Sequence, residues 1–121
     1  MSILSKVLIG IIAFEHLYIL WVEMFAWTTV GKKMFKSLPE HLFESTKGLA
    51  ANQGLYNGFL AAGLVWSLII SDVAWASNIS IFFLGCVVTA GVYGGLSASK
   101  SILLKQALPA AIVLVLTLIL K

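Results

Sequence analysis

The residues best suited to chemistry in this sequence stand inside an apolar stretch near its start. Glu15, His16 and Glu23 interrupt the largely hydrophobic run from Leu4 to Thr29. Because a helix turns by about 100° per residue, these three side chains would project within an arc of about 100° on one helical face. Carboxyl and imidazole groups in such a place can transfer protons, act as general acid and base, or bind a small ligand.

A second set of polar side chains stands on one face of the next apolar segment. Its members share an arc of about 140° and are Asn52, Gln53, Tyr56 and Asn57. In antiparallel neighbouring helices this set would lie at the depth of Glu23, and His16 would pair with one of its Asn or Tyr side chains. Tyr93 and Gln106, from two later segments, would lie at the same level. The sequence therefore predicts a polar pocket in one half of a helical bundle.

Interhelical hydrogen bonding is the alternative interpretation of these polar groups. Amide and hydroxyl side chains stabilise membrane helix packing by about 1 kcal/mol or less each. Packing needs no carboxylate, however, and an ionised carboxylate costs roughly 3 kcal/mol to place in hydrocarbon. We therefore interpret the set as a ligand or proton site without assigning a catalytic role. It comprises Glu15, His16, Glu23, Asn52, Gln53, Tyr56, Asn57 and Tyr93.

The sequence gives little indication of a metal, a cofactor or a nucleic acid. It has no Glu-x-x-His or His-x-x-x-His pair and only one cysteine, Cys86. A lone histidine such as His16 is weak evidence for haem. All 8 basic residues are lysines, and the absence of arginine disfavours phosphate, nucleotide and nucleic-acid recognition. We expect no metal and no cofactor, and the lipid bilayer, a small molecule or a proton as partners.

The composition determines which elements must position these residues. The chain has 121 residues, of which 60% are hydrophobic and 11% charged, too apolar for an ordinary soluble domain. A span needs roughly 20 apolar residues, so about four spans with short loops fit and no soluble domain does. Backbone groups in lipid must bond internally, which requires helices. We predict one all-α domain, 1–121, a bundle of four transmembrane helices at about 4–29, 50–70, 74–96 and 102–120.

The distribution of lysines predicts the orientation of these spans. The first and third loops together carry Lys32, Lys33, Lys36, Lys47, Lys100 and Lys105. The second loop holds Asp72 and no lysine. Positively charged loops stay in the cytoplasm, so we expect a multi-pass protein of the cell membrane with loops one and three cytoplasmic and both termini outside. The predicted polar pocket then lies in the cytoplasmic half.

Two further patterns concern loops and packing. The stretch from Ser37 to Glu40, Ser-Leu-Pro-Glu, has the spacing of a capping box, which predicts a short interfacial helix with Leu38, Leu42 and Phe43 toward lipid. The spacing Gly-x-x-x-Gly occurs at Gly54 and Gly58 and again at Gly91 and Gly95. Such pairs favour close helix packing, either within the chain or between copies in a homo-oligomer.

Three functions fit these features. Small-ligand binding or transport coupled to protons, with Glu15 exchanging a proton for a cargo, leads. A membrane-embedded enzyme that uses Glu or His as general acid and base to isomerise or epimerise a lipid-soluble substrate is the alternative. A structural subunit that docks onto a larger membrane partner is the third.

Two stretches of the sequence resemble a known family. The first, Phe14 to Trp27, reads FEHLYILWVEMFAW, and the second, Asn52 to Gly63, reads NQGLYNGFLAAG. Both are similar to the signature of a bacterial family of small membrane proteins called domain of unknown function 1304, over the whole chain. The resemblance implies a four-span bacterial membrane protein without an established activity, and it supplies no catalytic residues.

Overall fold

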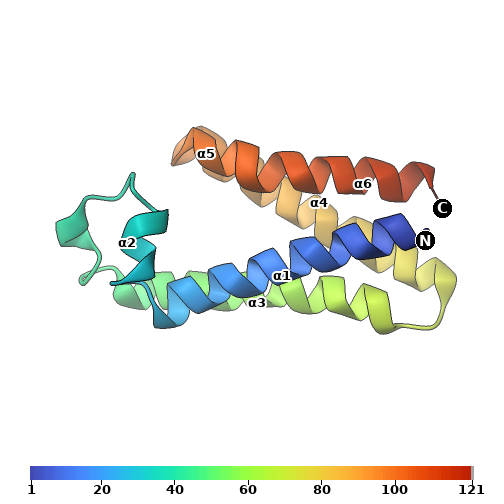
Figure 1. Ribbon diagram of the computed structural model, residues 1–121, viewed down its shortest axis with the longest axis horizontal. Helices are drawn as coiled ribbons and strands as arrows, with labels where there is room; N and C mark the ends of the chain where they lie inside the picture. The colour runs from blue at the N-terminus through green and yellow to red at the C-terminus, as the bar shows by residue number, and fades with distance from the viewer. Residues whose placement is uncertain (121) are drawn as a thin grey trace.

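The computed structural model of the protein describes residues 1–120, and this range is helical with no strand. Four long helical runs account for most of it (Figure 1). They are α1 (Ile3–Phe25), α3 (Lys47–Ile69), α4 (Val73–Ser97), and a C-terminal run of α5 (Lys100–Ile102), the π-helical segment η2 (Leu103–Ala107) and α6 (Leu108–Ile119). The predicted all-α fold class is confirmed.

Three of these runs are long and apolar enough to cross a membrane, namely Ile3–Phe25, Val73–Ser97 and Lys100–Ile119. Three such helices indicate a multi-pass membrane protein. The helix α3 has the same length as α1, 23 residues. It is more polar because it carries Asn52, Gln53 and Asn57, and it does not reach the same hydropathy.

Local sequence explains where the long helices begin. Ser2 caps α1 by accepting a hydrogen bond from the backbone N–H of Ser5, and Asp72 caps α4 by accepting one from Trp75 at 3.0 Å. In the C-terminal run, Pro109 has no backbone N–H and its ring crowds the carbonyl group of Lys105. These effects favour the wider π-helical winding of η2 just before it.

The long helices form two antiparallel hairpins, α1 with α3 and α4 with the C-terminal run (Figure 1). The loop between α1 and α3 and the turn between α4 and α5 lie at one end of the molecule. The start of α1, the end of α6 and the turn between α3 and α4 lie at the other. We call these the loop end and the terminus end.

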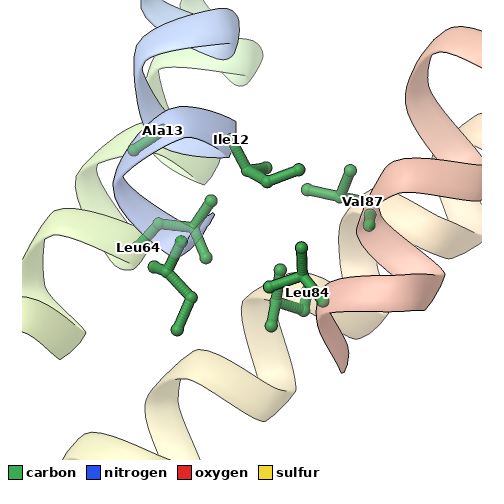
Figure 2. Close-up of a cluster of buried hydrophobic side chains, with 8 residues drawn as sticks. Ile12, Ala13, Leu64, Leu84 and Val87 are labelled. Atoms are coloured by element: carbon green, nitrogen blue, oxygen red, sulfur yellow. The ribbon is translucent and has the colours of Figure 1, made fainter. Parts of the chain in front are cut away.

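A cluster of buried apolar side chains joins the two hairpins (Figure 2). All four runs contribute, and the members are Ile9, Ile12, Ala13, Leu64, Leu84, Val87, Ala110 and Val113. Lipid tails are as apolar as these side chains, so in a membrane the cluster stabilises the fold through close packing and dispersion rather than through removal from water.

Both Gly-x-x-x-Gly pairs lie where two helices of the chain approach closely. A Cβ atom on Gly58 would lie 2.6 Å from Leu20 Cδ1 of α1, and one on Gly54 would lie 3.2 Å from the carbonyl oxygen of Leu20. Gly91 and Gly95 face η2 in the same way, and a Cβ atom on Gly91 would lie 2.6 Å from a backbone nitrogen of η2. Intrachain packing therefore occupies both glycine faces.

The loop between α1 and α3 differs from the prediction. In place of an interfacial helix starting near Ser37, a five-residue helix, α2 (Val30–Met34), forms earlier, and only a 3-10 turn, η1 (Glu40–Leu42), follows. No side chain caps η1. Phe43, expected to face lipid, is only 1% exposed. The loop folds back on the end of α1 because Phe43 packs on Trp27, with ring centroids 4.9 Å apart.

Candidate functional site

The candidate site centres on Glu23, whose buried carboxyl group accepts a hydrogen bond from another helix. Glu23 lies in the last turn of α1 and is 7% exposed. Its Oε1 accepts a hydrogen bond of 2.6 Å from Asn57 Nδ2 on α3. This contact depends on the close approach of the two helices, because a Cβ atom on Gly54 would lie only 3.0 Å from Glu23 Cβ.

Asn57 is itself oriented by its own helix. Its Nδ2 also donates to the backbone carbonyl of Gln53 at 3.3 Å, so both amide hydrogens have acceptors. The second oxygen of Glu23, Oε2, receives no hydrogen bond from the described residues, and no described polar side-chain atom is both fully buried and unpaired. Oε2 is therefore free to bind another group.

Glu23 lines an open pocket of about 530 Å³ at the loop end. The walls of the pocket come from the end of α1, the loop that follows, the start of α3 and the turn between α4 and α5. Glu23 is the charged residue among the described residues that line it, and Gln53 contributes an amide. The volume lies within the range of about 300–1,000 Å³ that is usual for small-molecule sites.

Aromatic side chains form one side of this pocket. Trp27 follows the end of α1, and its indole Nε1 donates to Thr46 Oγ1 at 3.0 Å. The ring of Phe35 lies 5.2 Å from that of Trp27, centroid to centroid, and both residues line the pocket. The hydrogen bond and the packing on Phe43 hold the indole ring in place beside Glu23.

His16 lies deeper in the molecule and is fully buried. Its Nδ1 is 2.9 Å from the carbonyl oxygen of Ile12, which can only accept, so Nδ1 carries a hydrogen. Its Nε2 is 3.1 Å from Nε2 of Gln106 in η2, and the amide donates to the neutral ring. This hydrogen bond links the two hairpins.

The expectation that His16 pairs with an Asn or Tyr side chain of the second segment is therefore wrong. Its partner is Gln106 of the fourth helical run. The ring lies one turn before Leu20, which contacts the glycines of α3, and it reaches Gln106 from the neighbouring part of the α1 surface.

The remaining predicted residues are not gathered in the pocket. Glu15 is partly buried and does not line it. Asn52 is exposed and also lies outside it. Tyr56 is 52% exposed and packs edge-on against Phe59.

Tyr93 lies on the outer face of α4, away from Glu23. It is 74% exposed and borders a separate open depression of about 740 Å³ together with Phe82, Cys86 and Thr89. Gly91 and Gly95 bury their side of α4 against η2, and Tyr93, two residues from each, points roughly the opposite way. Within residues 1–120, no group of three His, Cys, Asp or Glu side chains could hold a metal ion.

The aromatic wall of the pocket, formed by Trp27 and Phe35, was not predicted from the sequence. Trp27 lies near the end of the predicted first span, 4–29, and Phe35 lies in the loop that follows, where the sequence pattern gave neither residue a role in the site. One signal was present, since Trp27 follows Glu23 by four residues and that spacing places two side chains on the same side of a helical turn. Gln106 was expected at the right depth, but its partner was not.

The chain is similar to known proteins over most of its length. Residues 10–118 match the family described as "Protein of unknown function (DUF1304)". The chain is 32% identical over 108 residues to "Uncharacterized protein YpaA" from Lactococcus lactis subsp. lactis (strain IL1403), covering 88% of this chain and 89% of that protein. No solved structure is significantly similar to the chain. The matched range includes Glu23, Asn57 and Gln106, and the chain belongs to the DUF1304 family of proteins of unknown function.

Proposed function

We propose that this protein is a four-span membrane carrier that binds a small ligand in the pocket beside Glu23 and exchanges it for a proton. One observation carries the proposal. A buried carboxyl group that lines an open pocket has one oxygen fixed by Asn57 at 2.6 Å, and its other oxygen has no hydrogen-bond partner among the described residues. Interhelical packing alone would not require the second oxygen to remain unpaired.

The helix α3 is the fourth span in this proposal. It is antiparallel to α1, equally long and packed along it. Two of its three amide side chains are accommodated, because Asn57 bonds to Glu23 and Gln53 lines the pocket. Polar side chains in membrane helices are tolerated where they face a partner helix or a water-filled cavity.

The charges at the two ends favour a cytoplasmic mouth for the pocket. The loop between α1 and α3, the first residue of α3 and the C-terminal run carry six exposed lysines: Lys32, Lys33, Lys36, Lys47, Lys100 and Lys105. Asp72 lies at the terminus end. By the positive-inside rule, the loop end then faces the cytoplasm and both chain ends face outward.

A carrier that moves a ligand across a membrane must have a state in which its binding pocket opens to one side only. Ile12, in the apolar cluster, precedes Glu23 by 11 residues, or about 16 Å along α1. The cluster shown in Figure 2 fills the space between the hairpins on that side. Transport would require the hairpins to rock, which breaks the hydrogen bond between His16 and Gln106.

Glu23 would couple the ligand to the proton. A carboxyl group in surroundings of low dielectric constant is stable when a proton or a bound partner neutralises it. Ligand and proton therefore compete for the same oxygen, Oε2. Binding of the ligand should release a proton.

The test is binding to the purified protein of three probes with similar phenyl groups and different charge: tetraphenylphosphonium, triphenylphosphine oxide and tetraphenylborate. We expect at least one to bind saturably with release of protons into weakly buffered solution, read with a pH dye. Glu23→Gln should abolish proton release. Glu15→Gln is the matched control, because Glu15 lies on the same helix outside the pocket.

Two results would reject the proposal. In the first, none of the three probes binds the wild-type protein saturably with release of protons. In the second, Glu15→Gln reduces proton release as strongly as Glu23→Gln, in which case the pocket beside Glu23 is not the coupled site.

A further inference from the structure

We infer that the ligand of the pocket beside Glu23 is an organic cation, a positively charged group carried on an apolar body. The inference rests on the proposed function and names its substrate class. It follows from the charge, the aromatic wall and the apolar lining of the pocket.

The charge of the lining is negative. Among the described residues that line the pocket, Glu23 is the charged one, and its Oε2 is without a hydrogen-bond donor. An anionic ligand would meet this carboxylate and find no lysine on the walls. The lysines of the loop end are exposed, and salt screens their charges over roughly 8–10 Å.

Trp27 supplies the second feature that a cation requires. The face of an indole ring attracts a cation within about 6 Å, more strongly than the face of any other side chain does. Trp27 is held by its hydrogen bond to Thr46 and by contacts with Phe35 and Phe43. A cation paired with Oε2 of Glu23 would meet an indole that is already fixed in place.

The rest of the lining excludes a bare metal ion and favours an apolar body. A metal such as Ca²⁺ needs six to eight oxygen ligands. The pocket offers the carboxylate of Glu23, the amide of Gln53 and a hydroxyl group of Ser37, while Thr46 already accepts from Trp27. Its other walls are apolar side chains, Leu38, Leu49 and Ile102 among them.

The experiment compares the affinities of the same three probes by fluorescence titration and calorimetry. Tetraphenylphosphonium should bind at least about tenfold more tightly than the neutral triphenylphosphine oxide, the minimum expected of a carboxylate and an indole acting together. Tetraphenylborate should bind most weakly. Glu23→Gln should lower the affinity for the cation by about tenfold and leave that for the neutral probe nearly unchanged.

Variants of exposed or peripheral residues keep the test valid if Glu23→Gln does not fold. Gln53 is exposed and lines the pocket, so Gln53→Lys should abolish cation binding and admit tetraphenylborate. Trp27→Leu should weaken cation binding, whereas Trp66→Leu should not, because Trp66 is exposed and lies outside the pocket.

Different results would reject the cation class and the ligand pocket itself. If the neutral or the anionic probe binds as tightly as the cation in the wild-type protein, the cation class is overturned and the ligand pocket stands. If none of the three probes binds, both proposals fall.

An ammonium group can come from a free solute or from a lipid headgroup. The titration is therefore repeated in nanodiscs of phosphatidylglycerol with and without phosphatidylethanolamine. A lower affinity of the wild-type protein for tetraphenylphosphonium when phosphatidylethanolamine is present, with the affinity for triphenylphosphine oxide unchanged, assigns the cation to the lipid headgroup. Unchanged tetraphenylphosphonium affinity assigns it to a free solute.

Discussion

At the scale of single residues, the two glutamates of α1 share a residue type and a helix but not an environment. Glu23 is 7% exposed, bonded to Asn57 and placed at a pocket wall. Glu15 has no hydrogen-bonded partner within the described part of the chain and lines no part of that pocket. A fixed carboxyl group beside a cavity is better suited to selective binding than an unfixed one. We therefore expect function to depend on Glu23 more than on Glu15.

The hydrogen bond between Asn57 and Glu23 gives a prediction about stability. Asn57→Leu removes the donor to Oε1 and leaves a buried acceptor without a partner. Hydrogen bonds between membrane helices contribute about 0.6 kcal/mol on average and at most about 1.7 kcal/mol. We expect the free energy of unfolding in mixed micelles, measured by denaturant titration, to fall by an amount in that range.

Asn52→Leu is the matched control for this change. Asn52 lies on the same helix, is exposed, and has no side-chain hydrogen bond to any described residue. Its replacement should change the free energy of unfolding by less than about 0.5 kcal/mol, as is usual for surface positions. An equal loss in both variants would show that the contact with Glu23 is not what stabilises α3 against α1.

At the scale of elements, close approach between helices depends on individual glycines. Gly91→Ala would place a methyl group 2.6 Å from the backbone of η2, whereas Gly85 on the same helix has no neighbouring atom within 4 Å. Overpacking costs about 1–3 kcal/mol, and alanine in an open helical position gains up to about 1 kcal/mol. We expect Gly91→Ala to lower the thermal midpoint and Gly85→Ala to maintain or raise it. Equal midpoints would contradict the packing of α4 on η2.

Periodicity and composition were sufficient to predict the four helical runs and the packing role of the glycines. They could not predict the partner of His16, because that partner depends on how far each helix is rotated about its axis. A rotation of one residue, about 100°, exchanges one neighbour for another. The π-helical segment that brings Gln106 to His16 leaves no periodic signal in the sequence.

The loop between α1 and α3 was predicted poorly for a related reason. The spacing of Ser37 and Glu40 indicated a helix start, but a local signal was overridden by a contact distant in sequence. Trp27 bonds to Thr46 across 19 positions and packs on Phe43. Burial of two aromatic rings outweighs the roughly 1 kcal/mol that a helix cap contributes.

At the scale of the whole molecule, the proposed carrier requires that α3 cross the membrane despite its polar residues. If it does, the two ends of α3 lie on opposite sides of the bilayer. Ser45, two residues before the start of α3, and Ser71, between α3 and α4, are both exposed and would report on these sides. Single-cysteine variants Ser45→Cys and Ser71→Cys, made in a Cys86→Ala background, allow this to be measured with a membrane-impermeant thiol reagent.

We expect the reagent to label Ser71→Cys from outside intact cells and Ser45→Cys only in inverted membrane vesicles. The reason is that the lysine-rich loop end should face the cytoplasm while the terminus end, with Asp72, faces outward. Labelling of both cysteines from the same side would mean that α3 does not span, because the chain would then return without crossing. The pocket beside Glu23 would in that case lie at a membrane surface, and the carrier proposal would fail along with the four-span topology.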